Sequence, residues 1–156
     1  MLGVNSRTRT VLLDVDGCLT DGKVIFNQDG TSARAFHARD RVAIRRMSAL
    51  GWEIHIVTMS DWIGTRLWAA RLPVILHQAS QKTPDEIRKI TRRRPFYACG
   101  DDPVDYDMLC MAERAFAPAD ADPRLRNMVE GLEVLPMGGG EGIVWEILDR
   151  IGVPNK

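Results

Sequence analysis

Carboxylates that directly follow apolar runs are the most informative feature of this sequence. Asp14 and Asp16 follow a short apolar run that begins at Thr10, and Asp101 and Asp102 follow another run further along the chain. Short continuous apolar runs are typical of buried strands. Carboxylates gathered at strand ends repel each other and are stable there only with a cation or with shared protons. These residues therefore predict a metal site.

Three further polar residues stand in similar places. Thr58 ends the segment EIHIVT, Lys82 follows the segment PVILH, and Asp105 lies one helical turn beyond Asp101. The carboxylates offer only oxygen ligands and no His or Cys stands at ligand spacing, so Mg²⁺ is the expected ion. Lys82 and Thr58 would add a positive charge and a hydrogen bond for a phosphate. Together the residues predict phosphoryl transfer, in which a carboxylate can be the nucleophile.

The stretch LLDVDGCLTDG, residues 12–22, fits neither a calcium loop nor a nucleotide-binding loop. Counted from its first aspartate, the positions where a calcium loop needs Gly and Glu hold Leu and Ile. The pattern GxxxxGK[ST] is missing, which excludes a Walker loop. A structural alternative is that Asp14 and Asp16 only cap a helix or shape a turn. Lys82 and Asp101, at the ends of later strands, argue against that alternative.

The rest of the chain alternates short apolar runs with amphipathic helical patterns. One helix is expected to begin at Asp40, a second after an N-cap at Asp61, and a third after an N-cap at Thr83. Strands are expected at residues 10–13, 53–58, 73–77, 96–99, 115–118 and 133–135. This order predicts a Rossmann-like α/β fold, a mostly parallel sheet with helices on both faces. Ligands of such sheets bind beyond the carboxyl ends of the strands, which would bring the polar residues to one edge.

A β-hairpin is predicted around Asp29-Gly30, within residues 23–36. The segments between the polar residues leave no room for an inserted cap domain, which needs about 50 residues or more. We therefore expect one domain over residues 1–156, with the hairpin as a small flap. A two-stranded arm is marginally stable alone, so either the site is open or a neighbouring subunit covers it.

Bulk composition limits the function further. The 156 residues carry a formal net charge of zero, which gives no argument for nucleic acid or an anionic membrane as partner. No apolar run approaches the roughly 18 residues of a membrane-spanning helix. The 3 cysteines form no CxxC pair, which is typical of a reducing compartment. A cytoplasmic protein is the expectation. The run Arg92-Arg93-Arg94 is interpreted as a solvated helix end rather than a phosphate site.

The motifs DVDG at residues 14–17, Thr58, Lys82 and GDDPVD at residues 100–105 resemble those of the haloacid dehalogenase-like hydrolases. More narrowly, DVDGCLTDG, FHARD, GDDPVD and GGGEG resemble the small phosphatases of the 3-deoxy-D-manno-octulosonate 8-phosphate phosphatase type, which lack a cap domain. The resemblance covers roughly residues 10 to 150. It implies a Mg²⁺-dependent phosphatase, and it implies a homotetramer in which each site is closed by a neighbouring subunit.

The resemblance also implies roles for the matched residues. Asp14 would be the nucleophile, and Asp16 would protonate the leaving alkoxide and then activate water. Thr58 would bind the phosphate, and Lys82 would neutralise it and orient Asp14.

The same resemblance implies a metal site. Asp14, the backbone carbonyl of Asp16 and Asp101 would hold Mg²⁺. Asp105 would hold Lys82 or a metal-bound water, while Asp102 is either a supporting residue of the site or a helix cap.

Substrate contacts are predicted at Arg39, Asp40, Arg41 and Ser60. This sequence departs from the group's usual pattern at three places. Met59-Ser60 stands where the group has Gly followed by Arg or Glu. Arg41 stands where the group has Gly, and Trp145 stands where it has Arg. These departures fall on positions expected to read the substrate and leave the carboxylates, Thr58 and Lys82 unchanged.

The predicted function is hydrolysis of a small phosphomonoester, a sugar-acid phosphate of the 3-deoxy-D-manno-octulosonate 8-phosphate type, through an aspartyl-phosphate. Two alternatives stay open. One is a phosphatase or phosphotransferase that acts on another metabolite or a nucleotide. The other is a non-catalytic regulatory relative, against which the lack of Asp at residues 77–81 argues, because a receiver domain carries its acceptor Asp after the third strand.

Overall fold

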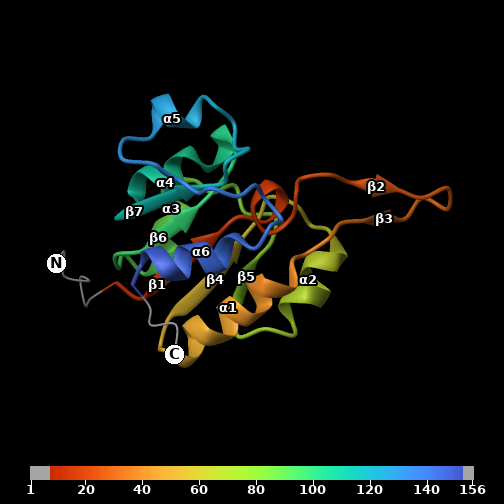
Figure 1. Ribbon diagram of the computed structural model, residues 1–156, viewed down its shortest axis with the longest axis horizontal. Helices are drawn as coiled ribbons and strands as arrows, with labels where there is room; N and C mark the ends of the chain where they lie inside the picture. The colour runs from red at the N-terminus through yellow and green to blue at the C-terminus, as the bar shows by residue number, and fades with distance from the viewer. Residues whose placement is uncertain (1–7, 153–156) are drawn as a thin grey trace.

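The computed structural model describes residues 8–152. Its centre is a six-stranded parallel sheet in the order β5-β4-β1-β6-β7-β8 (Figure 1). The strands of this sheet are β1 (Thr10–Leu13), β4 (Glu53–Val57), β5 (Ile75–His77), β6 (Tyr97–Cys99), β7 (Arg114–Ala117) and β8 (Glu133–Val134). The parallel order confirms the predicted α/β fold.

Helices cover both faces of the sheet. The helices are α1 (Ala38–Ala49), α2 (Ile63–Ala69), α3 (Pro84–Thr91), α4 (Tyr106–Met111), α5 (Leu125–Met128) and α6 (Ile143–Arg150). One apolar core joins α1, α2 and α6 to the sheet, and a second joins α3, α4 and α5 to the opposite face. Successive residues of β1 serve the two cores alternately, since Val11 and Leu13 join the first and Leu12 the second.

Two helix starts differ from the prediction. Helix α1 begins at Ala38, because the ring of His37 caps it by accepting a hydrogen bond from the backbone N–H of Arg39 at 3.1 Å. Helix α2 begins at Ile63 with Trp62 in the N-cap position, so the expectation that Asp61 caps this helix is wrong.

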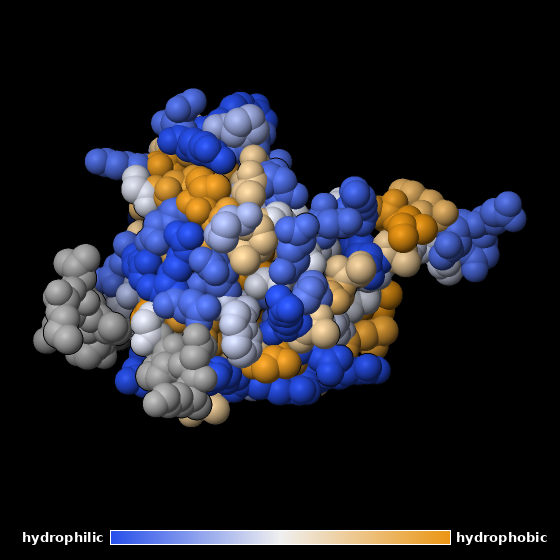
Figure 2. All heavy atoms as spheres, viewed as in Figure 1, coloured by the Kyte–Doolittle hydropathy of each residue, from blue (hydrophilic) through white to orange (hydrophobic). Residues whose placement is uncertain are grey.

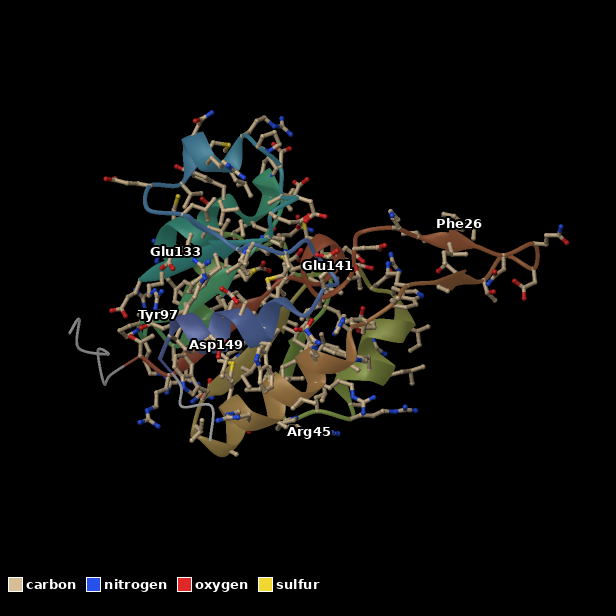
Figure 3. All side chains as sticks on the ribbon, viewed as in Figure 1. Phe26, Arg45, Tyr97, Glu133, Glu141 and Asp149 are labelled. Carbon is tan, nitrogen blue, oxygen red and sulfur yellow. The ribbon has the colours of Figure 1, made fainter. Side chains whose placement is uncertain are left out.

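The predicted hairpin is formed by β2 (Ile25–Phe26) and β3 (Ser32–Ala33), and it projects from the body of the molecule (Figure 1). Apolar side chains gather on this arm (Figure 2). Phe26 is 79% exposed and stands well away from the sheet (Figure 3). Among residues 8–152, no helix is long and apolar enough to cross a membrane.

Candidate active site

The carboxyl ends of four neighbouring strands meet around one cavity. Asp14 follows β1, Thr58 follows β4, Lys82 lies five residues beyond β5, and Asp101 lies two residues beyond β6. The cavity measures about 300 Å³ and is lined by Asp14, Asp16, Gly22, Thr58, Met59, Ser60, Lys82, Asp101, Asp102 and Val104. The fold thus brings together predicted residues that lie as far apart in the sequence as Asp14 and Asp102.

Lys82 is buried between two carboxylates. Its ammonium lies 2.5 Å from Asp14 Oδ1 and 2.5 Å from Asp105 Oδ1. Burial alone would lower the pKa of Lys82, but the charges of Asp14 and Asp105 outweigh it and raise the pKa above its usual value. Lys82 also has a left-handed backbone with φ of 55°, which places a non-glycine residue in a strained conformation beside the site. The lysine is therefore a fixed positive charge at the nucleophile candidate.

The acidic groups carry more negative charge than Lys82 balances. Burial first, and then the charge of Asp105, raise the pKa of Asp14 well above its usual value, although Lys82 opposes this. Burial and Asp105 also raise the pKa of Asp101 to about 6. Ligand atoms of Asp14, Cys18 and Asp101 lie within 4.8 Å of one another. A divalent cation bound between Asp14 and Asp101 would favour the charged forms of both carboxylates, so the pair is a candidate metal site.

Asp105 joins the lysine to the loop that carries Asp101. Its Oδ1 pairs with Lys82, and its Oδ2 accepts the backbone N–H groups of Asp101 at 3.0 Å and Asp102 at 3.2 Å. Gly100 gives the room for this arrangement, since a Cβ there would lie 2.5 Å from Asp105 Cβ. The prediction that Asp105 holds Lys82 agrees with this geometry.

Asp102 acts as a cap. Its Oδ1 accepts the backbone N–H of Val104 at 3.1 Å, and it forms a capping box with Asp105 at the 3₁₀ turn Pro103–Asp105. Asp102 also lines the cavity, so it shapes the wall without pairing with Lys82.

Glycines allow the turn Val15–Leu19 to approach the rest of the site. Gly17 has φ of 87°, and a Cβ there would lie 1.8 Å from Asp101 Oδ2. The loop with Gly139 presses on the other side, because a Cβ on Gly139 would lie 2.0 Å from the carbonyl oxygen of Gly17. Asp120 holds that loop by accepting the N–H of Gly139 at 2.9 Å. The turn that carries Asp16 is therefore clamped from two sides.

The phosphate-binding candidate Thr58 is buried and is fixed by its own loop. Its hydroxyl oxygen accepts the backbone N–H of Ser60 at 3.1 Å, and Ser60 Oγ accepts that of Trp62 at 3.2 Å. Both Thr58 and Ser60 line the cavity, as predicted.

The predicted substrate contact of Asp40 is wrong. Asp40 has no exposed surface, and its Oδ1 accepts the backbone N–H of Val144 at the start of α6 at 2.8 Å. Burial raises the pKa of Asp40 to about 7. Its neighbours Arg39 and Arg41 are exposed, and neither lines the cavity. The segment 39–41 thus attaches α1 to α6 and does not reach the cavity of its own chain.

Arg34 is a residue of the site that sequence reasoning missed. It directly follows β3, and its Nε lies 2.9 Å from Asp16 Oδ1. Nothing in the order of residues marks this cation, because its place depends on how the hairpin folds back onto the turn after β1.

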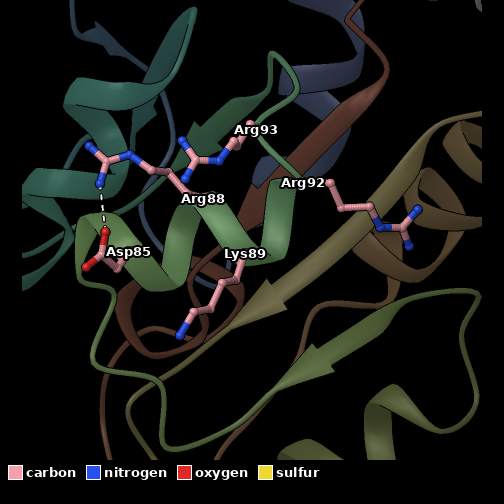
Figure 4. Close-up of a pocket in the computed structure, with 5 residues that line it drawn as sticks. All are labelled: Asp85, Arg88, Lys89, Arg92 and Arg93. Carbon is pink, nitrogen blue, oxygen red and sulfur yellow. Dashed lines mark hydrogen bonds and ion pairs between the residues drawn. The ribbon is translucent and has the colours of Figure 1, made fainter.

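A second hollow, of about 330 Å³, lies at the end of α3 beside four cations and Asp85 (Figure 4). Arg88 pairs with Asp85 at 2.9 Å, and Lys89 and Arg92 point away from the other cations (Figure 4). The residues Arg92, Arg93 and Arg94 are exposed, in agreement with a solvated helix end. The hollow therefore gives no reason to change the interpretation of Arg92-Arg93-Arg94 as a solvated helix end.

Comparisons with known proteins agree with this geometry. No protein-family model matches the chain. The 3-deoxy-D-manno-octulosonate 8-phosphate phosphatase KdsC of Haemophilus influenzae is 30% identical over 148 residues, which are 90% of this chain and 81% of that protein. KdsC of Escherichia coli K12 is 29% identical over 149 residues, 92% of this chain and 78% of that protein.

Solved structures share the fold. The phosphatase of the same name from Moraxella catarrhalis, in complex with magnesium, phosphate and KDO, superimposes with a TM-score of 0.85 at 22% identity, over 92% of this chain and 85% of that one. The cobalt-bound Haemophilus influenzae enzyme gives 0.85 at 25% identity, over 96% of this chain and 90% of that one.

The parallel sheet and the carboxylate-lysine cluster at its edge define a metal-dependent phosphatase of the α/β class. The sequence match to KdsC of Haemophilus influenzae covers 90% of this chain and 81% of that protein, which shows the family. The chain belongs to the haloacid dehalogenase-like hydrolases, in the group of KdsC phosphatases that lack a cap domain.

Proposed function

We propose that the protein is a Mg²⁺-dependent phosphatase of a small sugar-acid phosphate, of the 3-deoxy-D-manno-octulosonate 8-phosphate type. The observation that carries this proposal is the buried ion pair of Lys82 with Asp14 at the carboxyl end of β1. The names of the curated relatives supply the substrate class.

Asp14 is the proposed nucleophile. Its carboxylate oxygen forms a bond to phosphorus as the bond from phosphorus to the ester oxygen breaks, and Asp16 gives a proton to the departing alkoxide. Asp16 then takes a proton from water, whose oxygen displaces Asp14 from phosphorus and releases inorganic phosphate. Lys82 and Thr58 stabilise the phosphoryl oxygens throughout, since positioned charges are the main source of catalysis in this reaction class.

Mg²⁺ is the proposed cofactor, held by Asp14, the backbone carbonyl of Asp16 and Asp101. Burial, and after it the charge of Asp105, raise the pKa values of Asp14 and Asp101. A bound cation would favour the charged forms of both carboxylates, which supports this assignment. When bound, the ion neutralises the phosphoryl group and orients it for in-line attack.

Ser60 and the adjoining Met59 are proposed to contact the organic part of the substrate. Both line the cavity beside Thr58. Ser60 stands where the group usually has Arg or Glu, and a hydroxyl cannot make the bidentate contact of a guanidinium to a carboxylate. The substrate is therefore expected to be bound with fewer charged contacts at this point than in the group as a whole.

The assembly proposed is a cytoplasmic homotetramer of single-domain subunits, residues 1–156, in which the hairpin of residues 23–36 covers a neighbour's site. Ile25 at 62% exposure and Phe26 at 79% support this, because exposed apolar residues on a two-stranded arm favour burial against another chain. Light scattering that gives a monomer at working concentrations would contradict it.

A phosphate-release screen tests the proposed function. The substrates are p-nitrophenyl phosphate, sugar phosphates, keto-sugar-acid phosphates and nucleotides, each with Mg²⁺ and with EDTA. Mg²⁺-dependent release that is highest for a keto-sugar-acid phosphate is expected. Asp14→Asn should abolish it, whereas the matched control Asp85→Asn, on the exposed surface of α3, should not. Release by no substrate would contradict the proposal, and preference for nucleotides would contradict the substrate class.

A further inference from the structure

Arg34 lies at the base of the hairpin and reaches the active site of its own chain. Its side chain is 12% exposed, and its Nε lies 2.9 Å from Asp16 Oδ1. The Nε–H is not aligned with that oxygen, so the contact is an ion pair rather than a directed hydrogen bond. Thr20 Oγ1 donates a hydrogen bond to the same oxygen at 3.2 Å. Both contacts fall on Oδ1, which fixes the orientation of the Asp16 carboxylate and leaves its Oδ2 in neither contact.

Aromatic rings fix the guanidinium of Arg34. Its Cζ lies 4.5 Å from the centre of the Trp62 ring, within the range of a cation–π contact. Trp62 stacks on Phe36 with centroids 6.3 Å apart, and Phe36 stacks on Trp68 at 4.2 Å. Trp68 packs against the apolar core of the α1 face. Arg34 is thus tied to the body of the protein by a stack of rings, which limits its rotamer freedom.

The same stack meets the phosphate-binding loop. The backbone N–H of Trp62 bonds to Ser60 Oγ, and that of Ser60 bonds to Thr58 Oγ1. Arg34 therefore contacts Asp16 directly. It also contacts Trp62, whose backbone is hydrogen-bonded to Ser60 in the loop after β4. An exposed ion pair with no such support would contribute little.

We infer that Arg34 is a positioning residue, which holds the carboxyl group of Asp16 in the orientation needed for proton transfer to and from the substrate. The inference rests on the proposed function, since it assigns Arg34 a part in the chemistry of that same site. It differs from a role in substrate binding, because the contact that carries it is made to Asp16 itself.

The test compares esters that need a proton from Asp16 with an ester that does not. An alkyl ester such as ribose 5-phosphate must have its departing alkoxide protonated, whereas p-nitrophenolate leaves as a stable anion. The parameter kcat/KM covers only the steps up to release of the alcohol, so it isolates this first proton transfer. A misplaced general acid therefore lowers kcat/KM for the alkyl ester selectively.

Arg34→Gln is expected to lower kcat/KM for ribose 5-phosphate at least about tenfold more than for p-nitrophenyl phosphate, since a positioned acid contributes about 10² or more. Arg34→Lys keeps the charge and should recover part of the difference. Trp62→Leu removes the ring under the guanidinium and should give the same selectivity in weaker form. Arg45→Gln, an exposed arginine of α1 that bonds to the carbonyl of Arg71, is the control and should leave the ratio unchanged.

Equal losses on both esters, or no loss on either, in a folded Arg34→Gln variant would overturn the inference while leaving the phosphatase itself in place. A keto-sugar-acid phosphate, which is also an alkyl ester, replaces ribose 5-phosphate in the ratio if the wild type does not turn over ribose 5-phosphate. A wild-type protein that releases phosphate from no substrate of the screen with Mg²⁺ would instead overturn the proposed function, and the inference with it. If Arg34→Gln does not fold, as judged by circular dichroism, the ratio in Trp62→Leu decides, and an unchanged ratio there overturns the inference.

Discussion

The ammonium of Lys82 lies 2.5 Å from Asp14 Oδ1 and 2.5 Å from Asp105 Oδ1, in a site where Lys82 and Asp105 have almost no exposed surface. Two carboxylates and one ammonium leave one negative charge in excess. The excess is the physical reason to expect a divalent cation there, and the buried lysine is the reason to expect an oriented nucleophile.

Replacing this lysine should cost both activity and stability. Lys82→Ala leaves Asp14 and Asp105 facing each other without a counter-charge, and breaking one side of a buried ion pair costs about 3 kcal/mol or more. Urea denaturation should show that loss in the free energy of unfolding, and phosphate release should fall below detection. Lys89→Ala, an exposed lysine of α3, should change neither. Wild-type stability in Lys82→Ala would mean that the buried pair is not formed in solution.

Magnesium should stabilise the folded protein through Asp101. A ligand that binds only the folded state raises the unfolding free energy as its concentration exceeds its dissociation constant. Thermal unfolding is therefore expected at a higher temperature with Mg²⁺ than with EDTA, and Asp101→Asn should remove most of that shift. Asp102→Asn should retain it, because Asn also caps the turn. An identical shift in wild type and Asp101→Asn would contradict the assignment of Asp101 to the metal.

Asp40 should make the protein less stable as the pH rises through the weakly acidic range. Burial raises the pKa of Asp40 to about 7 from an ordinary 3.8, so between these values the folded chain holds a proton that the unfolded chain has lost. The free energy of unfolding should fall as the pH rises from about 4 to about 7, by at most about 4 kcal/mol for this group.

Asp40→Asn should flatten that part of the pH profile, because the amide keeps the acceptor for the N–H of Val144 and does not ionise. Asp85→Asn, on the exposed surface of α3, serves as a comparison for a change of charge away from Asp40. Denaturant melts at several pH values measure both. A profile that Asp40→Asn leaves as steep as in the wild type would rule out Asp40 as the source.

The loop at Gly139 should tolerate no side chain. A Cβ at Gly139 would lie 2.0 Å from the carbonyl oxygen of Gly17, so Gly139→Ala must displace the turn that carries Asp16. Because about 1 Å of misplacement can cost about 10² in rate, kcat should fall by roughly that factor. Gly138→Ala, whose Cβ would have its nearest contact with the side chain of Asp120 at 3.1 Å, should be far milder. Similar kcat values in the two variants would contradict the claim that Gly139 holds the turn Val15–Leu19 in place.

The strand ends were predictable because the physics that places them is local. Each apolar run ends at a polar residue, and parallel strands bring those residues to one edge whatever the loops do. The sequence therefore sufficed to group Asp14, Thr58, Lys82 and Asp101 around one cavity. It also predicted the exposed hairpin, whose turn residues are a short-range signal.

Arg34 could not be predicted, because its contact with Asp16 depends on the direction in which the hairpin leaves the body. Asp40 was assigned to the substrate because buried and exposed carboxylates look alike in a sequence. A signal was nevertheless present. Asp40 stands three, four and seven residues before Ala43, Ile44 and Met47, which places it on the buried side of α1.

The most direct test of the account is to find the phosphoryl group on the protein. Asp16→Asn, mixed with p-nitrophenyl phosphate and Mg²⁺ and quenched in acid, should accumulate an aspartyl-phosphate, because its formation needs no proton and its hydrolysis needs Asp16. Peptide mass spectrometry should locate the group on Asp14 and find none in Asp14→Asn. A phosphoryl group on another residue, or full turnover by Asp14→Asn, would contradict the assignment of Asp14 as the nucleophile.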